Sequence, residues 1–168
     1  HGGGVCTSSN AAGGFEWALE RAGENGKVLF FPDQHLGRNT ALAMGYQEED
    51  IAVWNPMSQP DWNDLNTSTF VLWHGYCSVH QRFTVEQIDN LREENPSALV
   101  IAHPECEREV VDASDASGST EMIRRFVADA PNGAVIGVGT EIHLVKRLDA
   151  QYPDKTVICL DPGDCPCS

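Results

Sequence analysis

The sequence predicts an α/β fold in which parallel sheets are covered by helices. Short apolar segments rich in β-branched residues alternate with longer segments whose apolar residues recur every three or four positions. This alternation favours strand–helix–strand units, whose strands pair in parallel. The chain has 168 residues, of which 41% are hydrophobic, enough for the core of one ordinary domain or two small ones.

Five segments are expected to be strands: residues 27–31, 69–73, 99–102, 134–138 and 156–160. Four expected helices have apolar stripes made of Phe15, Ala18, Leu19 and Ala22; Val85, Ile88 and Leu91; Met122, Ile123, Phe126 and Val127; and Leu144, Val145 and Leu148. Thr84 and Gln87 form a predicted capping box at the start of the second helix. Residues 55–69, which contain two prolines, interrupt the pattern and are interpreted as a surface insertion or an inter-domain loop.

A weak internal repeat suggests two similar units. Cys6 precedes a Pro-Asp pair at positions 32 and 33, and Cys77 precedes a Pro-Glu pair at positions 104 and 105. Each pair lies at the end of an expected strand, and the two copies are offset by roughly 71–72 positions. We therefore predict two α/β units, residues 1–72 and 73–168. The alternative is coincidence between two ordinary strand–helix–strand units.

The formal net charge is −14, from 11 Lys and Arg against 25 Asp and Glu. Such a charge repels phosphate backbones and anionic lipid surfaces, so we expect neither nucleic acid nor a membrane as a partner. The longest apolar runs are about five residues, whereas a membrane-spanning helix needs about 20. No secretory leader is recognisable, and we expect a cytoplasmic protein. An anionic substrate would need helix N-termini, hydroxyls or a metal to hold it.

Six cysteines offer either a disulfide framework or metal ligands: Cys6, Cys77, Cys106, Cys159, Cys165 and Cys167. Their uneven spacing and the expected reducing compartment favour ligation. Cys77 and His80, together with His103 and Cys106, could form a Cys2His2 zinc site from two loops. The cysteines could instead bind an iron–sulfur cluster, which takes thiolates from separate loops. The spacing alone leaves both possibilities open.

Polar residues gather at the expected carboxyl ends of the strands, where open α/β sheets bind ligands: Asp33, His35, Cys77, His80, His103, Glu105, Cys106, Thr140, Glu141, Cys165 and Cys167. Hydroxyls also lie at two expected helix starts, one with Ser8 and the other with Ser119 and Thr120. A helix N-terminus of this kind holds a carboxylate or phosphate. Plain N-capping is the alternative for each. Two such sites would suit a substrate with two acid groups.

Seven short motifs together resemble quinolinate synthase, the iron–sulfur enzyme family of de novo NAD biosynthesis. They occur in the family's order and cover nearly the whole chain: residues 5–11, 31–38, 73–80, 102–106, 118–120, 139–141 and 165–167. The resemblance implies three homologous, Rossmann-like αβα domains around a pseudo-threefold axis, with a central [4Fe–4S] cluster that takes one cysteine from each domain. This chain would provide the second domain, without its first strand, and the third domain.

The resemblance also implies the chemistry. The family condenses iminoaspartate with dihydroxyacetone phosphate to quinolinate, a transferase- or lyase-type condensation in which the open iron of the cluster acts as a Lewis acid. A functional link to L-aspartate oxidase is expected. Matched by motif, Cys77 is the expected cluster ligand of the second domain. Cys167, with Cys165 as the alternate, is the expected ligand of the third domain.

The remaining site residues follow from the same motifs. Ser8, Ser119 and Thr120 are expected to hold substrate acid groups. His103 and Glu105 are the expected catalytic and substrate-binding pair, Glu105 for proton transfer or hydroxyl binding and His103 for a hydrogen bond or general acid–base catalysis. The family's first domain and its cysteine are absent, so we expect this chain to be a fragment that is inactive alone. The alternative function is a non-catalytic α/β binding module stabilised by zinc on the four Cys and His residues described above.

Overall fold

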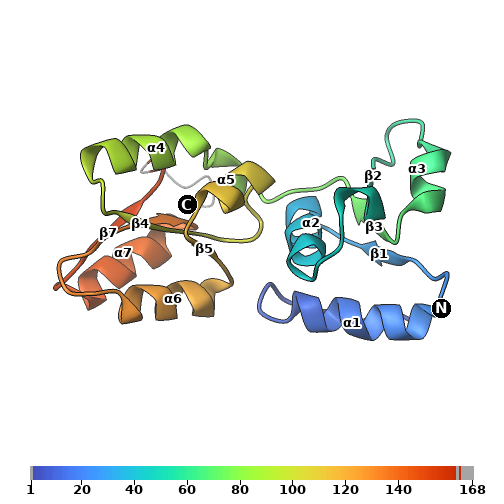
Figure 1. Ribbon diagram of the computed structural model, residues 1–168, viewed down its shortest axis with the longest axis horizontal. Coiled ribbons are helices and arrows are strands. Elements are labelled where there is room, and N and C mark those ends of the chain that lie inside the picture. The colour runs from blue at the N-terminus through green and yellow to red at the C-terminus, as the bar shows by residue number, and fades with distance from the viewer. Residues whose placement is uncertain (1, 162, 164–168) are drawn as a thin grey trace. The chain divides into compact units, whose positions relative to one another are not determined.

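The computed structural model describes residues 2–161 and 163. The chain folds into two compact units, and the boundary between them falls after Tyr76. Each unit contains one parallel sheet with flanking helices (Figure 1), which confirms the predicted α/β class. That the units are homologous domains of a three-domain enzyme, divided as residues 1–72 and 73–168, stays a prediction.

The first unit is built on three strands, β1 (Val28–Phe30), β2 (Ile51–Trp54) and β3 (Phe70–Trp73), in the order β1-β3-β2. All pairs are parallel, and Val71 of the central strand lies opposite Leu29 on one side and Ala52 on the other. The helices are α1 (Ala11–Ala22), α2 (Gln34–Ala43) and α3 (Trp62–Thr67), with a short 3-10 helix η1 (Glu48–Asp50). Apolar side chains from two helices and two strands form the core: Phe15, Val28, Ala41, Phe70 and Leu72.

The second unit contains four parallel strands in the order β5-β4-β6-β7. They are β4 (Leu99–Ala102), β5 (Ala116–Ser117), β6 (Val135–Gly139) and β7 (Thr156–Cys159). The helices are α4 (Val85–Glu94), α5 (Arg108–Ala113), α6 (Thr120–Asp129) and α7 (Ile142–Gln151), and a 3-10 helix η2 (His80–Arg82) precedes them.

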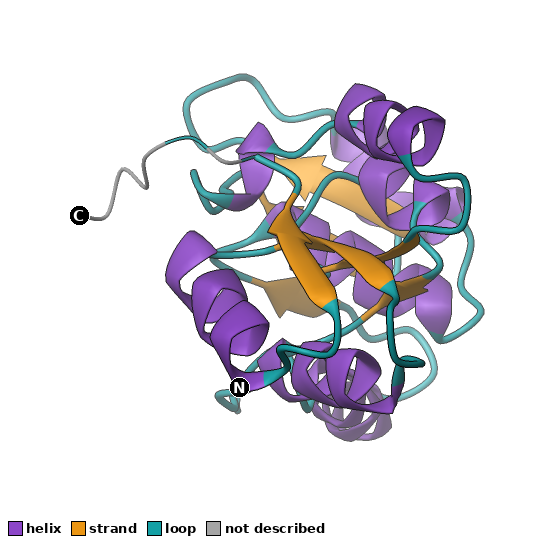
Figure 2. Cartoon of the chain, turned by 90° about the vertical axis from the view of Figure 1, so that its left-hand side faces the viewer, coloured by secondary structure: helices purple, strands orange, loops and turns teal. Residues whose placement is uncertain are grey.

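Helices cover both faces of this second sheet (Figures 1 and 2). Successive residues of a strand point to opposite faces. Accordingly, Val100 and Ala102 pack in one core cluster with residues of α4 and α5, whereas Ile101 packs in another with residues of α6 and α7. Burial on both faces explains why β4 is almost continuously apolar. The result is a three-layer αβα unit.

The structure confirms all five expected strands, all four expected helices and the Thr84–Gln87 capping box. It adds strands β2 and β5. A two-residue strand such as β5 leaves no periodic pattern in the sequence, so it could not be predicted. Helices α2, α3 and α5 were also not predicted. In α2 the buried face includes small residues such as Gly37 and Ala41 rather than a stripe of large apolar ones. Residues 55–69 connect the neighbouring parallel strands β2 and β3 and contain α3, so they form a crossover connection and the inter-domain interpretation is wrong.

Among the described residues, no helix has the length and hydrophobicity needed to cross a bilayer. The longest, α1, has 12 residues, whereas a span needs about 20.

Candidate functional site

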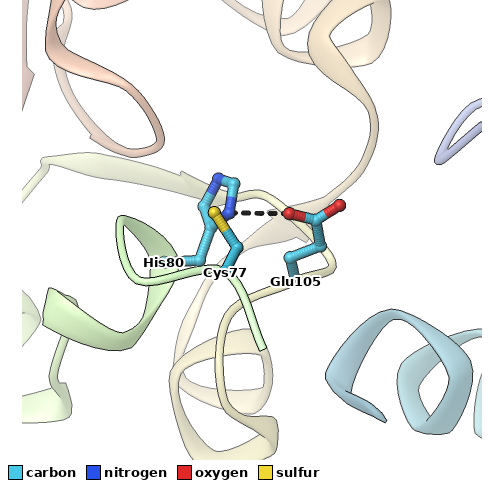
Figure 3. Close-up of side chains that lie close together, drawn as sticks. All are labelled: Cys77, His80 and Glu105. Atoms are coloured by element: carbon cyan, nitrogen blue, oxygen red, sulfur yellow. Dashed lines mark ion pairs between the residues drawn. The ribbon is translucent and has the colours of Figure 1, made fainter. Parts of the chain in front are cut away.

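Three side chains with different ligand atoms converge in the second unit (Figure 3). The Cys77 sulfur, an imidazole nitrogen of His80 and a carboxylate oxygen of Glu105 all lie within 4.8 Å of one another. His80 is buried, and the other two are partly buried. Sulfur, nitrogen and oxygen donors grouped in this way are able to hold a metal ion.

Two loops place these three residues together. The backbone N–H groups of His80 and Gln81 donate to the carbonyl of Cys77, at 3.1 and 3.2 Å, which closes a turn leading into η2. Glu105 follows the carboxyl end of β4, where the His103 N–H extends the sheet by donating to Gly139 O at 3.0 Å. The site therefore lies at the strand-end edge of the sheet, as the sequence predicted.

His80 connects Glu105 to the end of β6. Its Nδ1 lies 2.9 Å from Glu105 Oε2, and its Nε2 lies 3.4 Å from the Thr140 hydroxyl. The hydrogen bond from His80 holds the pKa of Glu105 below its ordinary value, although burial opposes the shift, and a hydrogen bond with Cys77 acts in the same direction as His80. Glu105 is consequently an ionised carboxylate near neutral pH.

His103 is buried beside this pair, and its ring stacks on that of His80 with 4.4 Å between centroids. The backbone N–H of Glu105 donates to His103 Nδ1 at 3.3 Å, so the neutral ring carries its proton on Nε2. Burial, followed by the nearby His80, lowers the pKa of His103 from 6.5 to about 4, and the Glu105 carboxylate opposes this shift. At neutral pH the ring is therefore an uncharged hydrogen-bond donor through Nε2.

This shift predicts acid sensitivity of the metal-free chain. His103 has a lower pKa in the folded than in the unfolded protein, so the unfolded protein binds more protons between about pH 6.5 and pH 4. The free energy of unfolding should be highest above pH 6.5 and fall by about 3 kcal/mol across that window, at 1.36 kcal/mol per pKa unit. Urea unfolding at a series of pH values, with a chelator present, measures this.

His103→Gln removes the titrating group and should flatten the dependence of stability on pH in the same window. His143→Gln, which removes an exposed imidazole in the same unit, is the matched control and should leave the slope unchanged. An unchanged slope in His103→Gln would show that another group is responsible.

The other described cysteines do not join the three donors. The Cys106 thiol is buried and donates to Gly139 O at 3.5 Å. The predicted Cys2His2 zinc site is therefore wrong, because Glu105 rather than His103 or Cys106 completes the donor group. The Cys159 thiol donates to Asp161 O at 3.0 Å, and burial raises its pKa, so it is protonated. Cys165 and Cys167 lie outside the described residues, and Cys6 lies in the first unit.

The predicted acid-group binders lie at helix starts, as expected. Ser119 is the N-cap of α6, and its hydroxyl accepts from Met122 N at 3.5 Å, a contact that matches plain N-capping. Thr120 is the exposed first residue of that helix. Ser8 is partly buried just before α1, in the first unit. The role of these three hydroxyls in substrate binding stays a prediction.

Sequence reasoning missed Arg82 and Asp161, which form an ion pair in the second unit with 2.5 Å between Nε and Oδ2. Asp161 comes soon after β7, so the rule that polar residues gather at strand ends could have found it. Arg82 belongs to no recognisable motif.

Comparison with known proteins identifies the family. Residues 2–168 match the family model described as quinolinate synthetase A protein. The chain belongs to this family. A quinolinate synthase from Corynebacterium glutamicum is 55% identical over 100% of the chain. Those from Rhodopirellula baltica and Geobacillus kaustophilus are each 46% identical, the first over 100% of the chain and the second over 99% of it. The predicted resemblance is thus confirmed. The chain matches 43%, 43% and 45% of these relatives, so it spans less than half of their length.

Membership in the quinolinate synthase family raises the question of whether the site suits an iron–sulfur cluster. Such clusters take thiolates from separate loops. Among the four described cysteines, Cys77 is the one grouped with other donors. The described residues would therefore suit one side of such a cluster, with one cysteine beside an ionised carboxylate and two imidazoles.

Proposed function

We propose that this chain forms part of a quinolinate synthase that condenses iminoaspartate with dihydroxyacetone phosphate in de novo NAD biosynthesis. The observation that supports this most directly is the convergence of Cys77, His80 and Glu105 at a sheet edge in a chain 55% identical to a named quinolinate synthase. Because the chain spans less than half of such relatives, the activity is proposed for a protein that also contains the rest of the family's sequence. We further propose that it is cytoplasmic, linked in function to L-aspartate oxidase, and inactive as the isolated chain.

The proposed cofactor is a [4Fe–4S] cluster to which Cys77 supplies one thiolate. Cys167, or its alternate Cys165, is proposed as a second ligand, and both lie outside the described residues. When bound, the open iron of the cluster would supply a Lewis acid that polarises a substrate carbonyl or hydroxyl.

The chain's own residues have distinct proposed roles next to that position. Glu105 is ionised and can accept either a proton or a hydrogen bond from a substrate hydroxyl. The ion pair with His80 fixes the orientation of its carboxylate. His103, neutral and protonated on Nε2, donates a hydrogen bond to a substrate oxygen. The hydroxyls of Ser8, Ser119 and Thr120 are proposed to hold the substrate's acid groups at helix starts, which avoids repulsion by the protein's negative charge.

A second candidate function is a non-catalytic binding module with a mononuclear zinc site. The specific observation in its favour is that the three donors already lie within 4.8 Å of one another. In this candidate zinc site, Glu105 is a ligand in place of His103 and Cys106. Three protein ligands leave one position of a tetrahedral zinc ion open.

A hybrid enzyme tests both candidates. In it, this chain replaces the matching segment of the C. glutamicum quinolinate synthase, which supplies the remainder of the family's sequence. We expect the anaerobically purified hybrid to contain iron and acid-labile sulfide and to form quinolinate from the two substrates. Stoichiometric zinc without sulfide would contradict the cluster proposal and support the zinc module.

A further inference from the structure

The Thr140 hydroxyl lies next to the ring nitrogen of His80 that faces away from Glu105. The distance from Thr140 Oγ1 to His80 Nε2 is 3.4 Å. Both residues are buried, and Thr140 is only 4% exposed, so water has little access to its hydroxyl. A buried hydroxyl needs a hydrogen-bond partner within the protein, and the His80 ring provides one.

The other ring nitrogen determines the direction of this hydrogen bond. Glu105 is an ionised carboxylate, which can only accept hydrogen bonds. His80 Nδ1, which lies 2.9 Å from Glu105 Oε2 (Figure 3), therefore carries a proton. In a ring with a single proton, Nε2 is then an acceptor, and the Thr140 hydroxyl donates to it. The imidazole thus accepts from Thr140 on one side and donates to Glu105 on the other.

The backbone around Thr140 is held by the sheet. Thr140 directly follows β6, whose last residue, Gly139, accepts from the His103 N–H at 3.0 Å. The Thr140 carbonyl accepts from the Cys159 thiol at 3.6 Å. Threonine is branched at Cβ, so its side chain has few χ1 rotamers. The hydroxyl is therefore a rigid donor that fixes a ring belonging to the 3-10 helix η2.

Glu105 loses a donor when Cys77 binds a metal. In the metal-free chain, hydrogen bonds with His80 and with Cys77 both hold the pKa of Glu105 down. A cysteine that binds an iron–sulfur cluster is a thiolate, which cannot donate a hydrogen bond. His80 then remains as the donor of this pair, so the orientation of its ring decides the orientation of the carboxylate.

We propose that Thr140 is a positioning residue, whose hydroxyl holds the His80 ring so that the proton on Nδ1 points at Glu105. This inference rests on the proposed function for its purpose, because Glu105 is the proposed proton acceptor. The hydrogen bond itself can be tested in the metal-free chain.

Nitrogen-15 NMR of the imidazole rings in the metal-free, reduced chain tests the hydrogen bond at a single neutral pH. The chemical shift of a ring nitrogen shows whether it carries a proton and whether it accepts a hydrogen bond, and the spectrum of His80→Gln identifies the His80 signals. We expect a protonated Nδ1 and an unprotonated, hydrogen-bonded Nε2. Thr140→Val keeps the size of the side chain but removes the donor, so the Nε2 signal should move to that of a nitrogen without a hydrogen bond. Thr140→Ser should restore the original signal.

Glu105→Gln separates the effect of Thr140 from that of the carboxylate. A glutamine side chain can donate or accept, so it does not itself require a proton on Nδ1. Thr140 should still keep the His80 proton on Nδ1 in this variant. The double variant Glu105→Gln with Thr140→Val should show a mixture of the two His80 tautomers.

Thr156→Val is the matched control. It replaces an exposed threonine at the start of β7 in the same unit and should leave the His80 signals unchanged. Circular dichroism melting curves check that each variant is folded.

In the hybrid enzyme, Thr140→Val is expected to lower kcat for quinolinate formation about fivefold, which corresponds to the loss of one net hydrogen bond. KM should stay unchanged, because Thr140 acts through His80 rather than on the substrate. Thr140→Ser should recover most of the loss, and Thr156→Val should cause none.

A proton on His80 Nε2 in the unsubstituted chain would overturn the proposal, as would identical His80 signals in the unsubstituted chain and Thr140→Val. An equal change in Thr156→Val, or a raised KM with an unchanged kcat in Thr140→Val, would overturn it as well. The proposed function fails in a different way. A hybrid without iron and sulfide would contradict it even if the His80 signals respond as expected.

Discussion

Glu105→Gln in the hybrid enzyme is expected to lower the rate of quinolinate formation by at least about 100-fold, while its iron and sulfide content stays unchanged. Gln keeps the size of the side chain and an oxygen that can accept the His80 hydrogen bond, but it cannot take up a proton. Glu105 is only partly buried, and Gln can keep the contact with His80, so the exchange should leave the fold intact. The measurements are initial rates of quinolinate formation and iron and sulfide analysis of the same samples.

Glu109→Gln is the matched control, since Glu109 is exposed on α5 a few positions further along the chain. It should keep full activity. Loss of iron in Glu105→Gln would show that Glu105 retains the cluster rather than acting in proton transfer. An unchanged rate of quinolinate formation together with an unchanged iron content would show that Glu105 is not a catalytic residue.

Cys77→Ser in the same hybrid is expected to reduce bound iron and acid-labile sulfide to background and to abolish quinolinate formation. A thiolate is the ligand that iron–sulfur clusters require, and a serine hydroxyl is not ionised at neutral pH. The substitution is nearly isosteric, so loss of the cluster would not result from a packing defect. Iron and sulfide analysis and the visible absorption spectrum provide the measurement.

Two serine variants serve as controls for Cys77→Ser. Cys6 lies in the first unit, and Cys159 is a protonated thiol that donates to backbone carbonyls. Neither is a proposed ligand, so both variants should keep their iron. A Cys77→Ser hybrid that retains a full complement of iron and sulfide would contradict the assignment of Cys77.

Much of the fold could be predicted because its local patterns are strong. Strand β4 is apolar on both faces and is followed at once by His103, which indicates a buried strand ending at a polar edge. Strand β5 could not be predicted, because two residues have no periodicity. Helix α2 was missed because its packed face includes Gly37, over which Leu72 and Phe30 lie closely. A search for large apolar residues at helical spacing does not detect a glycine over which other side chains pack closely.

The sequence predicted which residues are candidates for the site, but not which of their side chains lie together. The sequence selected Cys77, His103 and Glu105 as candidates, and one of the two metal sites it allowed placed Cys77 with Cys106. The backbone turn after β4 directs the Cys106 thiol toward Gly139 and leaves Glu105 beside His80. Which side chain of a short loop faces a site depends on that turn, and spacing does not specify it.

By itself, the sequence determined the family, the α/β class and the kinds of ligand atom available at the strand ends, because these depend on local pattern and residue type. The tertiary structure decided which of these atoms meet. It placed Glu105 with Cys77 and His80, and it joined Arg82 to Asp161, which are roughly 80 positions apart in the chain. Contacts between distant segments depend on strand order and register, which bring η2, the β4 loop and the end of β7 to one part of the second unit.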